Sequence, residues 1–342
     1  MSFRRTRLTL TAAACLFSLA GCINRNMIKT NTLPLIPDAA YAKGVSAPFC
    51  GIIGNTLFVA GGANFPEKSL LEGGPKRVYR DIWAFRDGEW SHAGLLPDST
   101  AYGATFNLGD RLLLAGGNVC GKTSAQLIEL RADGKVTLSG ELPFPVEQAG
   151  AAQDGDILYL VGGTSGAPVL SCTGGEWKQI ATLPQPLVQP VAFASNGKLF
   201  VWGGFNPETL LAPSEGLCLD LETLQWTEAP AIPDGGTFVG ATGHTLPDGR
   251  LIVVGGVNKA IFERALRNTP EDRIPYLSQD PSWYKFRKDV YIFDGNTWNC
   301  LGEAPEAALA GPGVAAAGKD VYVTGGELKP GVRSPRTFTF NY

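Results

Sequence analysis

A glutamate and an arginine lie six residues apart in the segment GGELKPGVR, residues 325–333. An arginine can pair with a carboxylate through two parallel hydrogen bonds, and a carboxylate in a partly desolvated pocket can exchange protons near neutral pH. Pro330 and Gly331 fit a tight turn that would bring Arg333 back toward Glu327. The spacing predicts an acid/base pair on a loop, and an exposed ion pair without a chemical role is also compatible with it.

The sequence offers few metal ligands. Its two histidines are His92 and His244, and it contains no C-x-x-C motif and no cluster of histidine, cysteine and carboxylate residues. We expect His92 on the surface and His244 in a polar site or a hydrogen-bonded core. The segment GGNVCGKT, residues 116–123, matches a phosphate-binding loop, but the stretch between it and the next turn is too short for the required helix. We therefore expect neither a metal nor a cofactor.

The glycine doublet before Glu327 is one of six that come directly after an apolar run. The doublets end at Gly62, Gly117, Gly163, Gly204, Gly256 and Gly326, with steps of 55, 46, 41, 52 and 70 residues. These steps bracket the period of a four-stranded propeller blade. In each copy, small residues, a turn and the apolar run indicate two antiparallel strands. The pattern resembles the Kelch repeat, which implies an all-β, six-bladed Kelch β-propeller.

The last copy has only three strands, because it ends at TFTFNY. The segment TNTLPLIPDA, residues 30–39, resembles the Leu-Pro segments after Trp177 and Trp226, two tryptophans that begin fourth strands. We expect this N-terminal segment to complete the last blade and close the ring, because an open sheet edge would otherwise be exposed. Two long segments, residues 63–80 and 258–288, are predicted to overhang one mouth of the channel.

The N-terminus has the pattern of an export signal, with three arginines and a short apolar stretch in residues 1–21. The tetrapeptide LAGC resembles a bacterial lipobox, which implies lipidation of Cys22, an anchor or linker over residues 22–29 and a location in the periplasm or outer membrane. An ordinary secretory peptide is the alternative. The propeller would occupy residues 30–342. Because no later apolar run could span a bilayer, membrane contact is expected only through the anchor.

Charge and cysteine content add further bounds. The chain has 29 basic and 32 acidic residues, and neither this balance nor any basic cluster indicates nucleic-acid binding. The cysteines beyond the lipobox are widely spaced, so we expect lone buried thiols. They are Cys50, Cys120, Cys172, Cys218 and Cys300.

Two stretches resemble the N-acetylneuraminate mutarotase (epimerase) family, bacterial Kelch proteins that interconvert the anomers of sialic acid. They are GHTLPDGRLIVVGGVNKAIF and GGELKPGVR, and the second matches the family segment G-E-x-K-P-G-x-R. The resemblance implies Glu327 in proton transfer and Arg333 in carboxylate binding or charge stabilisation. In the family this segment lies in the middle of the chain, whereas here it comes last. The chain therefore resembles a cyclically permuted member.

The implied substrate is a sugar acid, sialic acid, whose anomerisation needs neither metal nor redox cofactor. Tyr102, His244 and Asn258 are expected as polar lining, and Asn64 and Arg80 as candidate substrate contacts. Three alternatives stay open: a non-catalytic propeller that binds a protein or glycan, an isomerase of another sugar acid, and a Kelch-type copper radical oxidase. Two histidines supply the last of these poorly with copper ligands.

Overall fold

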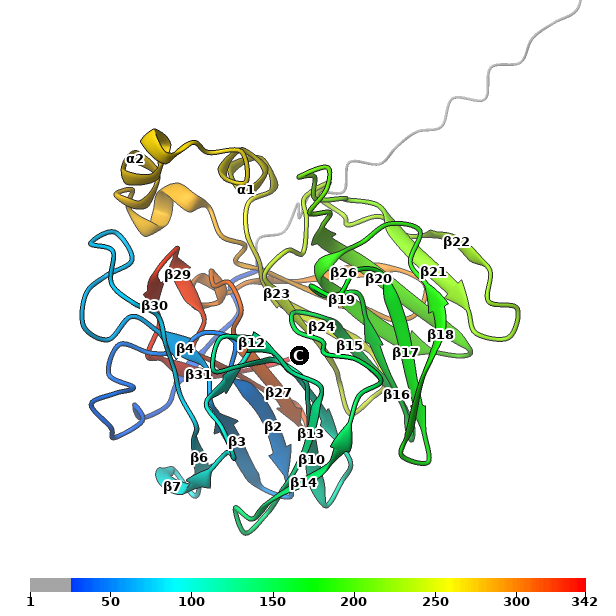
Figure 1. Cartoon of the computed structure of the whole chain (residues 1–342), viewed down its shortest axis with the longest axis horizontal. Helices are drawn as coiled ribbons and strands as arrows, with labels where there is room; N and C mark the ends of the chain where they lie inside the picture. Colours follow the sequence, from blue (N-terminus) through cyan, green and yellow to red (C-terminus); the bar gives the residue numbers. More distant parts are fainter. Residues whose placement is uncertain (1–25) are drawn as a thin grey trace, which may run out of the picture.

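The structure is a computed structural model that describes residues 26–342. The predicted export signal and Cys22 lie outside the described residues. Within the described part of the chain, strands form six four-stranded antiparallel sheets and a few two- or three-stranded ones (Figure 1). The all-β class is as predicted, and the arrangement of small antiparallel sheets is consistent with a propeller.

In five of the four-stranded sheets, neighbouring strands follow one another in sequence order. The strands of these sheets, in chain order, are β2 (Phe49–Ile53), β3 (Thr56–Ala60), β6 (Asp81–Arg86) and β7 (Glu89–Leu95); β9 (Ala104–Asn107), β10 (Arg111–Ala115), β13 (Gln126–Arg131) and β14 (Val136–Glu141); β15 (Gly150–Asp154), β16 (Ile157–Val161), β17 (Pro168–Thr173) and β18 (Glu176–Thr182); β19 (Val188–Ser195), β20 (Lys198–Phe205), β21 (Gly216–Asp220) and β22 (Trp226–Ala229); β23 (Ala241–Thr245), β24 (Leu251–Gly255), β25 (Asp289–Phe293) and β26 (Trp298–Glu303).

The sixth sheet combines both ends of the described chain. It contains β27 (Gly313–Ala317), β28 (Asp320–Thr324), β31 (Thr337–Asn341) and β1 (Asn31–Thr32), with β1 on the outer edge beside β31. Asn31 lies opposite Thr339, and the backbone N–H of Leu33 donates to the carbonyl of Thr337 at 2.9 Å. The predicted pairing of the N-terminal segment with TFTFNY is therefore present.

The glycine doublets join each sheet to the next. Gly326 donates its N–H to the carbonyl of Val45 at 2.8 Å, and a Cβ on Gly325 would lie 2.3 Å from that oxygen. Both glycines have positive φ, 65° and 90°. Four other doublets make the same bond from their second glycine, to the carbonyls of Thr100, Val146, Leu187 and Leu309. The repeat is therefore glycine-rich because two backbones meet there with no room for a side chain.

The apolar core lies between the sheets. Six clusters of buried side chains each join two successive sheets, such as Ile252, Val290 and Val321 between the fifth and sixth. The first strands of the sheets contact one another in the cycle β2, β9, β15, β19, β23, β27 and again β2. Tryptophans at the fourth strands also form hydrogen bonds between sheets. For example, the Trp226 indole N–H donates to the carbonyl of Thr182 in the preceding sheet at 2.9 Å.

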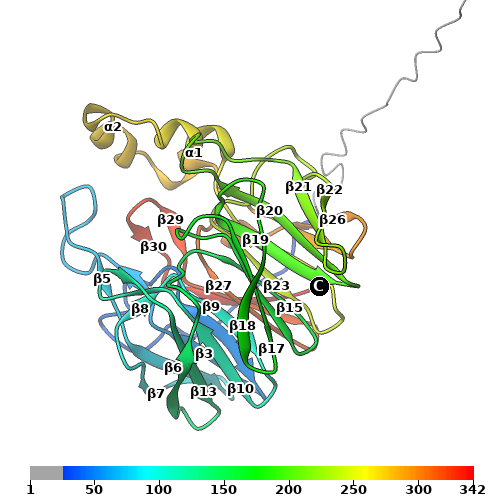
Figure 2. The same cartoon turned by 45° about the vertical axis from the view of Figure 1, so that its right-hand side comes forward.

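Shorter elements gather at the end of the sheets that carries the glycine doublets. Helices α1 and α2 lie outside the sheets, near the hairpin of β29 and β30 (Figures 1 and 2). Their bounds are β4 (Ala63–Asn64) and β5 (Arg77–Val78); β8 (Thr100–Ala101), β11 (Asn118–Val119) and β12 (Lys122–Thr123); β29 (Glu327–Lys329) and β30 (Val332–Arg333); α1 (Lys259–Ala265) and α2 (Arg273–Leu277); and the 3₁₀ turns Pro270–Asp272, Pro281–Tyr284 and Pro305–Ala307. Neither helix in residues 26–342 is long and apolar enough to cross a membrane.

Two sequence expectations are resolved by local structure. The segment GGNVCGKT forms the β11–β12 hairpin with no helix at Lys122, so it is not a phosphate-binding loop. Cys50, Cys172 and Cys218 are buried free thiols, as expected, whereas Cys120 is free but exposed. The expectation was wrong for Cys300, which is disulfide-bonded.

Pairing of the N-terminal strand should contribute measurably to stability. Leu33→Pro removes the N–H that donates to Thr337, and we expect a melting temperature lower by several degrees, at about 2–4 °C per kcal/mol lost. Leu35→Pro is the matched control, because the Leu35 side chain is exposed and the residue lies beyond β1. Equal melting curves for the two variants would contradict a stabilising role for β1.

Candidate active site

A cavity of about 470 Å³ opens at the centre of the six sheets, on the side of the glycine doublets. Its volume is typical of a pocket for a small molecule. All six inner strands, or the residues just before them, contribute to the wall, and the segment 258–288 adds an aromatic side. The polar and aromatic residues that matter below are Lys76, Tyr102, Gln148, Gln189, Thr242, His244, Asn258, Tyr276, Tyr284, Phe286 and Glu327.

A ring of left-handed residues, one from each sheet, forms the collar of this cavity. The collar consists of Ala47, Tyr102, Gln148, Gln189, Gly240 and Gly311, with φ between 51° and 70°. Backbone N–H groups link five successive pairs; for example, Tyr102 donates to Ala47 at 3.0 Å and Gln148 donates to Tyr102 at 2.9 Å. Four members are not glycine, although left-handed φ is unfavourable for other residues, and such strain is concentrated at functional sites.

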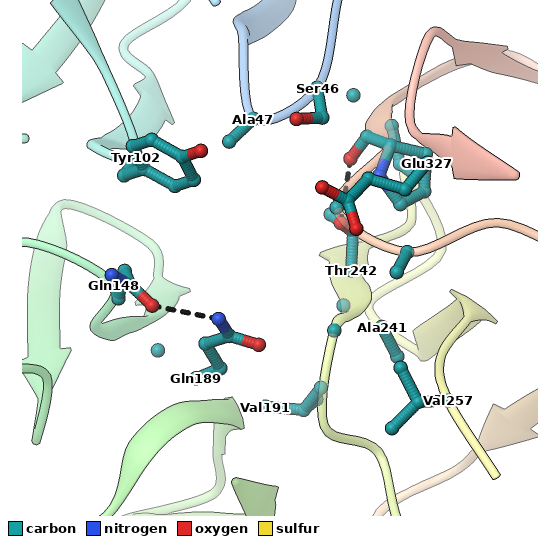
Figure 3. Close-up of a pocket in the computed structure, with 18 of the residues that line it drawn as sticks. Ser46, Ala47, Tyr102, Gln148, Gln189, Val191, Ala241, Thr242, Val257 and Glu327 are labelled. Carbon is teal, nitrogen blue, oxygen red and sulfur yellow. Dashed lines mark hydrogen bonds between the residues drawn. The ribbon is translucent and has the colours of Figure 1, made fainter. Parts of the chain in front are cut away.

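The collar gives the cavity two unlike sides. On one side, Ala310 pairs with Glu327, and the collar residues that follow one another there are the small Gly311, Gly240 and Ala47. Tyr102, Gln148 and Gln189 present polar side chains across from Glu327 (Figure 3). The amide of Gln189 donates to the Gln148 side-chain oxygen at 2.7 Å. This arrangement leaves an open space between one carboxylate and a fixed polar wall.

Glu327 and Arg333 are brought together by the β29–β30 hairpin, in which they are register partners. Arg333 Nη1 lies 2.5 Å from Glu327 Oε1, and Arg333 Nε donates to the carbonyl of Ala63 at 3.2 Å. The guanidinium also lies 5.3 Å from the ring centroid of Phe65. The Arg333 side chain is only 3 % exposed and does not line the cavity, whereas that of Glu327 is 27 % exposed and does. Arg333 therefore lies behind the carboxylate, held by Ala63 of β4 and by Phe65 just beyond that strand.

The electrostatics of the site favour a proton-exchanging carboxyl group. Burial raises the pKa of Glu327, while the charges of Arg333 and Lys76 act in the opposite direction. Burial lowers the pKa of His244 to about 4, so this imidazole is neutral at neutral pH. Within the described residues, Glu327 is the only acidic side chain in the cavity lining.

The structure brings some of the predicted site residues together and separates others. Tyr102, His244 and Asn258 line the cavity with Glu327, and Asn258 also caps α1 by accepting from the N–H of Ile261 at 3.1 Å. Asn64 and Arg80 do not line it, which corrects their assignment as substrate contacts.

Both misplaced residues have structural partners instead. Asn64 is fully buried, where its amide donates to the carbonyls of Ala40 and Gly44 and its oxygen accepts from Tyr79. Arg80 is exposed and donates to the carbonyl of Leu96 at 2.9 Å. Asn64 therefore closes the loop at the start of the first sheet rather than facing a ligand.

Sequence reasoning missed Lys76, Gln148, Gln189 and Tyr276. A signal existed for the glutamines, because they stand just before the small-residue strands in the place that Tyr102 occupies in its own copy. Lys76 and Tyr276 lie inside long connections, where no repeat defines which side chain turns inward.

The hairpin also anchors the helical insert. Lys329 Nζ donates to the carbonyl of Leu277 at 3.2 Å and to that of Gln279 at 2.6 Å. Both acceptors lie at the end of α2, one residue or three beyond Tyr276, which lines the cavity. Lys329 thus connects β29, which carries Glu327, with the aromatic wall of the cavity. This wall is formed by Phe262, Tyr276, Tyr284 and Phe286.

A sequence model of the N-acetylneuraminate epimerase family matches residues 20–138 and 140–342. The chain belongs to this family. The membership confirms the resemblance that GGELKPGVR indicates, and it applies to nearly the whole length of the chain.

Curated relatives of this family are similar over a part of the chain. An N-acetylneuraminate epimerase of Yersinia pestis (strain Pestoides F) is 30% identical over 217 residues, covering 57% of this chain and 55% of the relative. One from Haemophilus influenzae (strain PittEE) is 29% identical, covering 58% and 57%. One from Salmonella arizonae is 28% identical over 232 residues, covering 60% and 59%. The match thus spans little more than half the length of these relatives.

A solved structure shares the fold. The structure titled "Structure of YjhT" superposes with a TM-score of 0.52 at 24% identity, covering 59% of this chain and 65% of the other. At this identity the likeness bears on the fold alone.

Loss of the Lys329 contacts should loosen the aromatic wall. We expect Lys329→Met to cost about 1–2 kcal/mol of stability and to make the segment 258–288 easier to cleave by proteases, because the end of α2 loses its charged donor. Lys329→Arg should restore part of the protection. Lys178→Met, at an exposed position of β18, is the control. Proteolysis of Lys329→Met at the control rate would contradict this anchoring role.

Proposed function

We propose that the six four-stranded sheets are the blades of one Kelch propeller whose ring is closed where β1 pairs with β31. Three observations support this proposal: the cycle of contacts among the inner strands, the apolar clusters between successive sheets, and the collar with one residue from each sheet. The bond from Gly326 to Val45 joins the sixth sheet to the start of the first in the way that four other doublets join their neighbours.

We also propose that the chain is a cyclically permuted member of its family. In a cyclically permuted chain the termini lie in a different blade from those of its relatives, so that an ordinary alignment matches only one of the two exchanged segments. The relatives match 57–60% of this chain. Because a closed ring has no preferred starting blade, a chain whose termini lie in another blade can enclose the same cavity.

The function that the geometry supports best is interconversion of the α and β anomers of N-acetylneuraminate. The observation that carries it is Glu327, a carboxyl group backed by a buried arginine and directed into the central cavity (Figure 3). Family membership points to the same reaction. The reaction requires proton transfers and no change of oxidation state.

The chemistry can be assigned to this carboxyl group. Glu327 removes the proton from the anomeric hydroxyl, the bond between the anomeric carbon and the ring oxygen breaks, and the ring oxygen takes up a proton. The open-chain keto acid then rotates about the adjacent bond and closes on its other face, with the proton transfers reversed. One positioned acid/base group contributes about 10²–10⁴-fold to such a rate. Tyr102 lies across the cavity, where its hydroxyl can exchange a proton with the ring oxygen.

Arg333 has a different role from carboxylate binding, because its side chain lies behind Glu327 and outside the cavity lining. Its positive charge favours the ionised form of Glu327 and limits the rise in pKa that burial causes. Of the two roles implied by the family, charge stabilisation fits this position.

Replacement of Glu327 by glutamine tests the proposed reaction directly. Because an amide cannot accept the hydroxyl proton, we expect Glu327→Gln to lower the catalysed anomer exchange of N-acetylneuraminate by about 10²-fold or more. NMR saturation transfer between the two anomers measures this rate, and a melting curve checks the fold. Glu228→Gln, at an exposed position of β22, is the control. Unchanged exchange in folded Glu327→Gln would leave the binding-module interpretation ahead.

The pH dependence tests the role of Arg333. A catalytic base with a raised pKa loses activity as the pH falls through that pKa, so the acidic limb of the rate profile should lie above the 4.5 of an ordinary glutamate. Arg333→Met removes a charge that lowers this pKa, and the limb should move to higher pH. Arg336→Met, an exposed arginine three residues away, should leave it in place.

The raised pKa of Glu327 also makes the stability of the fold depend on pH. A raised carboxyl pKa means that the folded state binds the proton more tightly than the unfolded chain, so this contribution favours folding at low pH. It decreases as the pH rises through the raised pKa. Arg333→Met should therefore lose more stability at neutral than at acidic pH, relative to the wild type. A uniform loss at all pH values would show that Arg333 serves packing alone.

A further inference from the structure

Among the residues that the structure describes, a single lysine or arginine side chain lines the cavity. Among the described residues that line it there is one lysine, Lys76, and no arginine, while His244 is neutral because burial lowers its pKa to about 4. Arg333 is enclosed behind Glu327 with 3 % of its side chain exposed. A negatively charged ligand in this cavity would therefore find its opposite charge at Lys76.

The Lys76 side chain reaches the cavity across the Tyr102 ring. It lies in the connection between β4 and β5, and its Nζ is 3.3 Å from the Tyr102 hydroxyl and 4.8 Å from the centroid of that ring. Tyr102 is held in the collar by two backbone hydrogen bonds, to Ala47 and from Gln148. The ammonium group is thus positioned at the rim, while Lys76 as a whole is exposed and can turn its remaining donors to a ligand.

The charges of the proposed reaction create a need for such a group. Glu327 must be ionised to accept a proton, and a sugar acid brings a second carboxylate that is bonded to the anomeric carbon itself. Two carboxylates within a partly desolvated cavity repel each other strongly. Lys76 is close enough to Glu327 for its charge to lower the pKa of that carboxyl group. A cation in this place can offset the repulsion.

We propose that Lys76 binds the carboxylate of the substrate and so places the anomeric hydroxyl beside Glu327. The proposal rests on the proposed function for the identity of the anion. It makes Lys76 the residue that selects acidic over neutral sugars, with the polar wall of Gln148 and Gln189 left for the rest of the sugar. The carboxylate-binding role that the sequence assigns to Arg333 thereby moves to a lysine in another loop.

The test compares an acidic and a neutral substrate that share the reacting carbon. Anomer exchange is measured by NMR saturation transfer over a range of concentrations of N-acetylneuraminate and of its methyl ester, which keeps the hemiketal but lacks the charge. The variants are Lys76→Met and Lys76→Arg. Lys68→Met is the matched control, because Lys68 lies exposed in the same connection and does not line the cavity.

We expect Lys76→Met to raise KM for the acid by about tenfold or more, as loss of a hydrogen bond between charged groups does, and to leave KM for the ester unchanged. Lys76→Arg should retain most of the affinity for the acid, and Lys68→Met should behave as the wild type. An unchanged KM for the acid in Lys76→Met would overturn the proposal. So would an equal rise for acid and ester, which would indicate a merely structural role.

A separate binding measurement distinguishes this proposal from the proposed function. If the wild type accelerates exchange of neither compound, the mutarotase proposal fails. Titration calorimetry with N-acetylneuraminate then decides on Lys76 alone: binding that is present in wild type and Lys68→Met but lost in Lys76→Met supports the carboxylate contact. Absent binding in the wild type, or equal binding in all three proteins, overturns it.

Discussion

The backbone hydrogen bond from five of the six glycine doublets to the segment that leads into the next sheet is the contact on which the rest of the structure depends. In the last sheet, Gly326 donates to Val45, and the missing side chain of Gly325 lets the two backbones approach. The same bond recurs at four other sheet junctions and sets their spacing. Because it fixes the segment just before each inner strand, it also fixes the collar residues, which are held in left-handed conformations around the cavity.

The chemistry of the site follows from the different sizes of the collar residues on the two sides of the cavity. Where Gly240, Gly311 and Ala47 occupy the collar, the β29–β30 hairpin can bring the Glu327 carboxylate to the cavity, and burial there raises its pKa. Arg333 opposes this rise from behind the carboxylate, and its side chain does not line the cavity. Burial and ion pairing thus act on the pKa of this carboxyl group in opposite directions.

The features that sequence could predict are those encoded by short repeated patterns. The doublets, the alternation of small-residue and apolar strands, the N-terminal strand that pairs with TFTFNY and the Glu327–Arg333 hairpin all depend on neighbours close in sequence or on a repeated copy. The burial of Arg333 could not be predicted, because its acceptor, the carbonyl of Ala63, is 270 residues away. Asn64 illustrates the converse error: a polar residue just beyond a doublet can complete the hydrogen bonds of a buried loop instead of facing the cavity.

The junction between the first and last sheets holds the ion pair of the site. The Glu327–Arg333 hairpin belongs to the last sheet, yet Arg333 is held by Ala63 and Phe65, which lie just beyond the first doublet. Gly331 in its turn packs against Leu70 so closely that a Cβ would lie 2.4 Å from the Leu70 Cβ. The ion pair is therefore complete only when the first and last sheets lie side by side, which is also where β1 pairs with β31. The junction of the first and last sheets, whose outer edge carries the pairing of β1 with β31, therefore also brings the arginine to the Glu327 carboxylate.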